Sequence, residues 1–207
     1  MRRPTAGRVL LEGSDITEAS VREIREAGVG YIPEDRHRHG LLLEAPLWEN
    51  AILGHQTQPP NTNGMLIAAA AAKANTQRIV DAFDVRTPSI LVTAGSLSGG
   101  NQQKLIIGRE MSQSPRVLVA AHPTRGVDVG AQAAIWDLIK AARREGMAVL
   151  LISADLEELV GLSDTIKVIL RGRIVAEFDP DNVTREQLGA AMTGADGTAD
   201  EQMEAGR

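Results

Sequence analysis

The segment from residue 116 to residue 152 most constrains the fold, because two short apolar runs there flank one amphipathic helix. Residues 117–121 (VLVAA) form the continuous apolar run that a strand buried on both faces of a sheet requires. From Ile135 onward, apolar residues recur at the i, i+3, i+4 and i+7 spacing of a helix face, and Gly146 ends that helix before a second apolar run, MAVLLIS. Strand, helix and strand in this order predict a βαβ unit with parallel strands, and therefore an α/β fold.

Composition excludes several classes of protein. The 207 residues are 43% hydrophobic and 24% charged, close to the averages of folded soluble domains, so we predict a folded chain. A net charge of −5 and only 2% aromatic residues argue against nucleic acid as a partner. The absence of cysteine excludes disulfides and thiolate metal sites, and we predict no metal site of any kind. The longest apolar run, residues 65–72, is far shorter than the roughly 20 residues of a membrane helix, so membrane association should be peripheral.

The rest of the chain predicts additions on both sides of this unit. We expect residues 1–33 and 116–178 to form the α/β core, residues 34–115 a mostly helical subdomain, and residues 179–207 a C-terminal helix and tail. Because the first predicted strand already begins at Arg8, we expect the chain to begin inside a domain. The predicted strands are core-sheet strands at 8–12 and 29–32 and an antiparallel hairpin of 165–170 and 173–178. The predicted helices lie at 46–53, at 65–83 and at 184–192, and the last begins with a Thr-x-x-Gln capping box. We expect a charged loop at 34–40, further loops at 56–64 and 86–96, and a frayed tail at 196–207.

Residues 97–103 (LSGGNQQ) carry the sharpest chemical signal. Ser98 can cap the helix that follows, and Leu105 lies in its apolar stripe, which also includes Ile106 and Met111. The two glycines leave backbone N–H groups unshielded in the first turn. An anion there would meet these donors, the serine hydroxyl and the positive end of the helix dipole, so phosphate is the expected ligand. The same triplet is also compatible with a glycine hinge capped by a serine, and the surrounding motifs must decide between the two.

Four motifs follow one another along the chain: YIPEDRHRHGL, LSGGNQQK, HPTRGVDVGA and ISADLEEL. With these motifs in this order and at this spacing, the chain resembles the ATP-binding subunits of ATP-binding cassette (ABC) transporters. It is most similar to the second cassette of the double-cassette subunits that serve simple-sugar and nucleoside importers. The resemblance implies a P-loop NTPase fold, and in that family the signature motif LSGGNQ contacts the γ-phosphate of ATP held by the opposite cassette of a head-to-tail dimer. The residues matched to this role are Ser98, Gly99, Gly100, Asn101 and Gln102.

Other positions depart from the family pattern. No stretch of the chain contains the Walker A loop, G-x-x-x-x-G-K-[ST], which holds the β- and γ-phosphates. The strand that ends in Asp-Glu in the family ends here in Ala121 and His122, so the carboxylate that assists magnesium and the one that polarises water are both missing. Ala154 replaces the switch histidine, and Glu34 replaces the Q-loop glutamine. We therefore expect an incomplete P-loop-type domain that binds neither ATP nor Mg²⁺ alone.

The D-loop positions, by contrast, match the family. They are Arg125, Gly126, Val127 and Asp128, and in the family this loop lies across the dimer interface. Together with the signature motif, they imply a cassette that completes the ATP and Mg²⁺ site of a partner. The parts that act on the partner's nucleotide are therefore retained, whereas the parts that act on the chain's own nucleotide are lost.

Two positions have competing interpretations. His122 could be a replacement base, but a histidine next to proline at a strand end is more often a polar turn residue, and we favour that interpretation. The basic residues 36–39 (RHRH) could form a phosphate patch. Because Glu34 and Asp35 adjoin them, we favour a solvated loop.

The resemblance predicts the C-terminal cassette of an importer ATPase subunit for sugars or nucleosides. It places the chain peripherally on the cytoplasmic face of the bacterial inner membrane, with an intact ABC cassette and integral-membrane permease subunits as partners. Two alternatives remain: a permease-docking module that works without nucleotide, and a gene remnant without activity whose start codon lies inside a longer frame. The DNA upstream of Met1 separates them, because a Walker A loop encoded there would favour a truncated frame.

Overall fold

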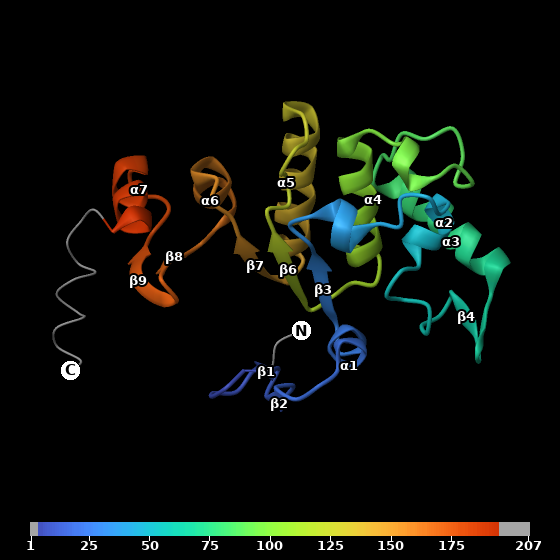
Figure 1. The fold of residues 1–207 in the computed structure, drawn as a ribbon, viewed down its shortest axis with the longest axis horizontal. Coiled ribbons are helices and arrows are strands. Elements are labelled where there is room, and N and C mark those ends of the chain that lie inside the picture. Colours follow the sequence, from blue (N-terminus) through green and yellow to red (C-terminus); the bar gives the residue numbers. More distant parts are fainter. Residues whose placement is uncertain (1–3, 195–207) are drawn as a thin grey trace. The chain divides into compact units, whose positions relative to one another are not determined.

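The computed structural model describes residues 4–194, which form two compact units (Figure 1). The first unit extends up to Leu150, and the second begins at Leu151. The predicted frayed tail at residues 196–207 lies outside the described residues. Between residues 4 and 194, no helix has the length and the apolar character needed to cross a membrane.

A three-stranded sheet contains both strands of the predicted unit, of which β6 is largely buried and β7 is not (Figure 1). Strand β6 (Val117–Ala121) lies between β3 (Val29–Ile32) and β7 (Ala148–Ile152), and β3 and β6 run parallel. Helix α5 (Val129–Arg144) connects β6 to β7, as the predicted unit of strand, helix and strand requires. The α/β fold predicted from the apolar runs is therefore present.

Three further pairs of strands form hairpins of their own and do not extend this sheet, and two of them share one kind of turn. Each of these two turns consists of a residue and a following glycine that both have positive φ, at Glu12-Gly13 (48° and 82°) and at Arg171-Gly172 (49° and 81°). Two-residue turns of this kind fold a strand straight back on its neighbour. The hairpin predicted for residues 165–178 is confirmed, but the N-terminal strand pairs locally instead of joining the core sheet. The strands of these two hairpins are β1 (Leu10–Leu11), β2 (Ser14–Asp15), β8 (Ile166–Leu170) and β9 (Arg173–Phe178).

Most of the remaining elements are helical. The predicted helix at 65–83 begins only at Ala69, because Leu66–Ile67, at the start of that range, pairs with Thr62–Asn63 at the end of the predicted loop in a short hairpin. The helix between β2 and β3 was not predicted from its charged sequence. The elements are α1 (Val21–Glu26), the π-helical turn η1 (Arg36–Gly40), α2 (Leu47–Ala51), β4 (Thr62–Asn63), β5 (Leu66–Ile67), α3 (Ala69–Ala82), the 3₁₀ turn η2 (Ala94–Ser96), α4 (Gly99–Met111), α6 (Leu156–Leu162) and α7 (Arg185–Thr193).

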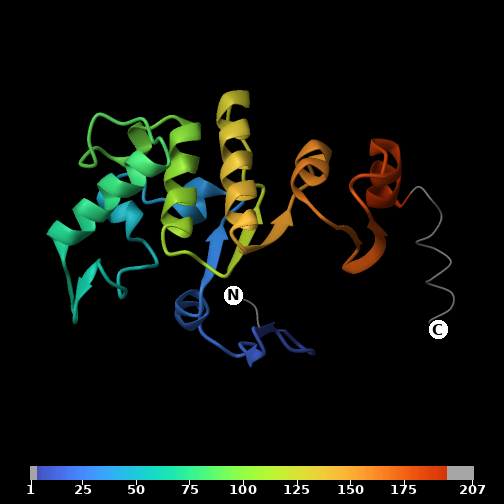
Figure 2. The same cartoon turned by 180° about the vertical axis from the view of Figure 1, so that it is seen from behind.

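Helix α4 lies at the centre of the first unit and packs against β3, α2, α3 and α5 (Figures 1 and 2). Leu105 and Ile106 are buried, as the predicted apolar stripe requires, whereas Met111 is only half-buried. A Cβ atom on Gly108 would lie 2.7 Å from Cγ2 of Ile79. A glycine at this position is therefore what lets the backbone of α4 approach α3 so closely.

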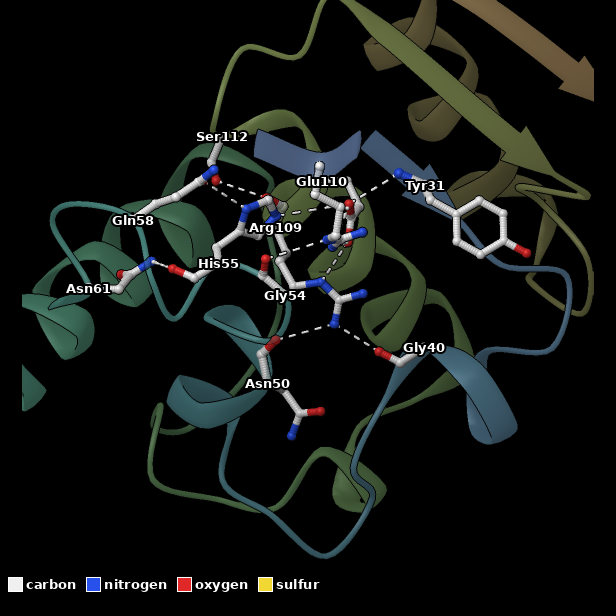
Figure 3. A network of polar contacts seen from close by, with 11 residues as sticks. Tyr31, Gly40, Asn50, Gly54, His55, Gln58, Asn61, Arg109, Glu110 and Ser112 are labelled. Atoms are coloured by element: carbon white, nitrogen blue, oxygen red, sulfur yellow. Dashed lines mark hydrogen bonds and ion pairs between the residues drawn. The ribbon is translucent and has the colours of Figure 1, made fainter. Parts of the chain in front are cut away.

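The last turn of α4 carries a buried ionic network (Figure 3). Glu110 is 1% exposed, and its carboxylate accepts hydrogen bonds from Nη2 of Arg25 (2.8 and 3.0 Å), Nε of Arg109 (2.9 Å) and the backbone N–H of Tyr31 (3.1 Å). Burial raises the pKa of Glu110, but the two guanidinium charges and the Tyr31 N–H outweigh it, so the pKa lies below its usual value. The network joins α4 to α1 and to β3.

Arg109 extends the network toward the other helices. It is 3% exposed, and its Nη1 donates to the carbonyl oxygens of Gly40 (2.8 Å) and Asn50 (3.2 Å). The buried His55 lies beside it, with Nε2 3.9 Å from a carboxylate oxygen of Glu110. Burial lowers the pKa of His55, which keeps the ring neutral near physiological pH.

The second unit has an apolar core of its own, formed between the hairpin and the last helix. Thr184 accepts a hydrogen bond from the backbone N–H of Gln187, whose side chain accepts one in return, so the predicted capping box is present at the start of α7. The buried residues of this core are Ile166, Val168, Leu188 and Ala191.

Candidate functional site

The signature segment folds as the sequence predicts, with Ser98 as the N-cap of α4. The Ser98 hydroxyl oxygen accepts hydrogen bonds from Nδ2 of Asn101 (2.9 Å) and, at 3.5 Å, from its backbone N–H. Gly99 and Gly100 form the first turn, where backbone N–H groups have no acceptor within the helix. Oδ1 of Asn101 in turn accepts from the backbone N–H of Arg86 at 2.8 Å, which fixes the amide side chain.

Gln102 points into the protein instead of toward solvent. It is 5% exposed, and its Nε2 donates to the carbonyl oxygen of Ala94 at 3.1 Å. Its Oε1 lies 3.2 Å from Nε of Arg36 and 2.9 Å from Nε2 of His37. Through these contacts, Gln102 connects the signature helix to the turn η1.

The D-loop residues lie beside the signature turn. Asp128 caps α5, with Oδ1 accepting from the backbone N–H of Ala131 at 2.9 Å. A Cβ atom on Gly100 would lie 3.0 Å from Cβ of Ala131, so the starts of α4 and α5 are in close contact. The buried Gln103 adds a further link, because its Nε2 donates to the carbonyl oxygen of Pro123 at 2.7 Å. The structure thus brings two of the predicted segments together.

Residues 34–39 are mostly exposed, as our interpretation of a solvated loop requires, but Arg36 is half-buried and joins this site together with Glu34. They lead into the π-helical turn η1, whose N-cap Asp35 accepts from the N–H groups of His37 and Arg38. Arg36 is half-buried and donates from Nη1 to the carbonyl oxygen of Arg125 at 2.8 Å, and Glu34 forms an ion pair with the side chain of Arg125. Arg36 and Glu34 thus each have a partner on the D-loop, whereas Asp35 is bonded within the turn itself.

The strand end has no carboxylate, as the sequence indicates. Ala121 is buried at the end of β6, and His122 follows it in a left-handed conformation with φ of 47°. The carbonyl oxygen of His122 accepts from the backbone N–H of Arg125 at 3.0 Å, which closes a turn before the D-loop. Ala154 belongs to the second unit, where it is exposed next to Asp155, the N-cap of α6. Within residues 4–194, no group of three or more His, Cys, Asp or Glu side chains is arranged to hold a metal ion.

Comparison with protein families gives these contacts their context. The family model of ABC transporters matches residues 1–125, which is more than half of the chain. The chain belongs to the ABC transporter family. The matched range includes the signature segment, the strand end and the first D-loop residue.

Individual ABC relatives support the same assignment. The chain is 43% identical over 196 residues to the guanosine import ATP-binding protein NupO of Bacillus subtilis (strain 168), which covers 94% of the chain and 38% of the relative. It is 42% identical over 202 residues to the glucose import ATP-binding protein TsgD13 of Haloferax volcanii, which covers 96% of the chain and 37% of the relative. It is 42% identical over 189 residues to the nucleoside import ATP-binding protein NupA of Lactococcus lactis subsp. cremoris, which covers 91% of the chain and 37% of the relative. The chain therefore spans less than two fifths of the length of these relatives.

Solved ABC cassettes have the same fold. A dimeric ATP-binding cassette in a post-hydrolysis state, bound to ADP and Pi, superposes with a TM-score of 0.71 at 19% identity, covering 86% of this chain and 75% of that one. A nucleotide-free ATP-binding cassette from an ABC transporter superposes with a TM-score of 0.70 at 22% identity, covering 93% of this chain and 75% of that one. The predicted P-loop NTPase fold of the ABC type is confirmed.

The sequence did not reveal two residues that organise the site. The charged sequence around Arg36 predicts a solvated side chain, yet its guanidinium lies between the signature helix and the D-loop. Gln103 follows the signature residues and was singled out for no role, yet it holds the turn after β6. No local sequence pattern indicates these contacts, because every residue that Arg36 or Gln103 bonds here lies at least 20 positions away along the chain.

Proposed function

We propose that the chain is the ATP-binding cassette of an ABC importer that contributes its signature motif to the ATP site of a partner cassette and does not hydrolyse ATP alone. One observation carries the proposal. Within the first unit, an ordered signature turn lies beside the D-loop, while the end of β6 presents Ala121 and His122 in place of carboxylates. The first feature suits a phosphate, and the second does not suit magnesium.

The signature turn has the donors that a phosphate requires. The N–H groups of Gly99 and Gly100 have no acceptor within the helix, and the positive end of the helix dipole lies at the same place. The Ser98 oxygen is fixed by Asn101 as an acceptor, so its hydroxyl proton is available to a phosphate oxygen. These groups can hold and orient the terminal phosphate of an ATP molecule that another cassette binds.

The strand end lacks the oxygen ligands that magnesium prefers. Ala121 offers only a methyl group, and the imidazole of His122 is a poor substitute for a hard carboxylate oxygen. When ATP and Mg²⁺ are bound to an ABC dimer, ATP would supply the phosphoryl group that water attacks and Mg²⁺ would neutralise its charge. In this chain, the residues at β6 neither polarise that water nor hold the ion, so we assign the chemistry to the partner.

The relatives suggest the transport role. Their names describe import of guanosine, nucleosides, glucose, ribose and xylose. We infer that the solute is a simple sugar or a nucleoside and that the permease is an integral-membrane partner. The chain would then bind peripherally at the cytoplasmic face of a bacterial inner membrane, as the second cassette of an importer ATPase.

The test uses an ABC cassette that retains its own Walker A loop but has its signature serine replaced by arginine. We call it the crippled cassette. Dimers of that cassette with itself lack a working signature and should hydrolyse ATP only at background. Addition of this chain should restore turnover, because its signature completes the partner's site. The chain alone should show no magnesium-dependent hydrolysis and no saturable ATP binding at micromolar concentration by isothermal titration.

The combined substitution of Ala121→Asp and His122→Glu provides a control for the other half of the proposal. It restores both carboxylates to the strand end but supplies no phosphate cradle, so the chain alone should remain inactive. Turnover by this variant alone would show that another segment replaces the Walker A loop. If the chain binds permease but never restores turnover to the crippled cassette, the docking-module alternative takes precedence.

A further inference from the structure

We propose that Arg36 is a positioning residue that holds the signature turn and the D-loop in one fixed arrangement, so that a partner's phosphate meets both at once. This inference rests on the proposed function. The geometry behind it lies entirely within the first unit and involves no bound group.

The contacts of Arg36 reach two elements with one planar group. Its Nε donates to Oε1 of the buried Gln102 in α4 at 3.2 Å, while Nη1 and Nη2 donate to the carbonyl oxygens of Arg125 (2.8 Å) and Gly126 (3.4 Å) in the D-loop. A guanidinium presents its donors in a rigid fork, so three acceptors on two segments are fixed relative to one another. Lysine, with a single ammonium, cannot reproduce this arrangement.

The guanidinium also lies against the phosphate-facing turn. A Cβ atom on Gly99 would be 2.8 Å from Nη2 of Arg36 and 3.1 Å from the carbonyl oxygen of Gly126. The residue that the resemblance assigns to the γ-phosphate is therefore in contact with both the arginine and the loop that it holds. A shift of the guanidinium would change the position of Gly99 relative to the D-loop.

The turn η1 explains how the arginine is presented. Asp35 caps this turn by accepting from the N–H groups of His37 and Arg38, which fixes the backbone on both sides of Arg36. One residue earlier, Glu34 pairs with the side chain of Arg125. Residues 34–36 thus hold the D-loop at two points, through its carbonyl groups and through a charged side chain.

Three of the five guanidinium N–H groups of Arg36 are used by protein acceptors, so we assign Arg36 to the protein and not to a nucleotide. Its effect should therefore appear in the rate of turnover more than in nucleotide affinity. Misplaced donors lose interactions that matter most in the transition state, which lowers kcat and changes KM little.

The experiment compares Arg36→Ala and Arg36→Lys with Arg38→Ala, an exposed arginine in the same turn. The first readout is hydrogen–deuterium exchange of the chain alone at two backbone-bonded amides, Gln102 in the signature helix and Arg125 in the D-loop. With Arg36→Ala, exchange at both amides should become at least about tenfold faster, as expected from the loss of charge-assisted hydrogen bonds. Exchange in the buried middle of α4 and throughout the Arg38→Ala variant should stay unchanged.

The second readout is turnover by the crippled cassette with each variant. Arg36→Ala should lower kcat by about tenfold with KM within about twofold, Arg36→Lys should recover part of the loss, and Arg38→Ala should match the unmodified chain. Unchanged exchange in Arg36→Ala would overturn the positioning role, and so would faster exchange with unchanged kcat. The exchange measurement needs no partner. If the unmodified chain fails to stimulate turnover, the proposed function fails, while the exchange result still decides whether Arg36 holds the two segments together.

Discussion

Helix α4 carries a polar cluster at each end, and the two clusters differ in burial. At its C-terminal end, Glu110 and Arg109 are almost completely inaccessible to solvent and bonded to each other. At its N-terminal end, Gln102 is buried, but its partner Arg36 is only half-buried and Arg125, whose carbonyl oxygen Arg36 also contacts, is exposed. A charge that loses its partner in the C-terminal cluster stays buried in a medium of low dielectric constant. A charge that loses its partner in the N-terminal cluster is solvated by water.

This difference separates stability from function along one helix. The buried cluster connects β3, α1 and the segments around Gly40 and Asn50, so it should determine whether the unit folds. The surface cluster contacts the signature turn and the D-loop, so it should determine how well the unit acts on a partner. Substitutions at the two ends therefore test whether the two roles are independent.

The largest expected effect is on stability, from Glu110→Gln. The amide keeps the shape of the side chain but leaves the buried Arg109 and the half-buried Arg25 without a counter-charge. Removing one partner of a buried ion pair costs about 3–5 kcal/mol, a large share of the roughly 5–15 kcal/mol by which domains are stable. Urea unfolding followed by circular dichroism measures the loss. A change below about 1 kcal/mol would mean that the network is hydrated and that the contrast between the two ends is mistaken.

Next in size is the effect of Gly99→Asp on stimulated turnover. An aspartate there would face the partner's phosphates and also contact Arg36, because its Cβ atom would lie 2.8 Å from Nη2 of that arginine. Loss of one well-placed donor lowers rates by about 10²–10³, so turnover of the crippled cassette should fall at least about tenfold, as it should with Ser98→Arg. Urea unfolding of the Gly99→Asp chain should change far less than that of Glu110→Gln. Full stimulation by this variant would make the signature segment only a helix start.

A smaller effect is expected from pH. Burial lowers the pKa of His55 below its usual value of 6.5, so the unfolded chain binds more protons than the folded chain as the pH falls from 6.5. The unfolding free energy should therefore be at its full value above pH 6.5 and decrease below it. Glu110, whose pKa lies below its usual 4.5, adds a further loss only below pH 4.5. His55→Gln should flatten the dependence between pH 6.5 and 4.5. An unchanged slope in that variant would show that His55 is not the group responsible.

Sequence patterns predicted the parts of the fold that depend on local chemistry. The apolar run of β6, the Ser98 cap and the Thr184 capping box each use residues within a few positions of one another, and each is present. Helix α1 could have been predicted by the same reasoning, because Ser20 and Glu23 form a capping box at its start. Its six charged and apolar residues were too short a run to show a helical period.

The contacts between distant segments could not be predicted in this way. The basic run at 36–39 is equally compatible with solvent and with a protein partner. Only the fold brings Arg36 within 2.8 Å of the carbonyl oxygen of Arg125, which lies 89 residues away. The position of Glu110 among two arginines and a strand N–H likewise depends on how β3 pairs with β6. Local sequence specifies the donors and acceptors, while the topology selects their partners.

The smallest expected effect comes from Glu34→Gln, the counterpart of Glu110→Gln at the other end of α4. Glu34 pairs with Arg125, but the two side chains are 54% and 64% exposed, so water screens the pair and solvates either charge alone. The unfolding free energy should change by less than about 0.5 kcal/mol in the urea titration used for Glu110→Gln. Because the same chemical change is made at both positions, the ratio of the two losses measures burial and not the identity of the residue. A loss from Glu34→Gln as large as that from Glu110→Gln would show that the surface cluster also holds the fold together, and the separation of stability from function along α4 would not hold.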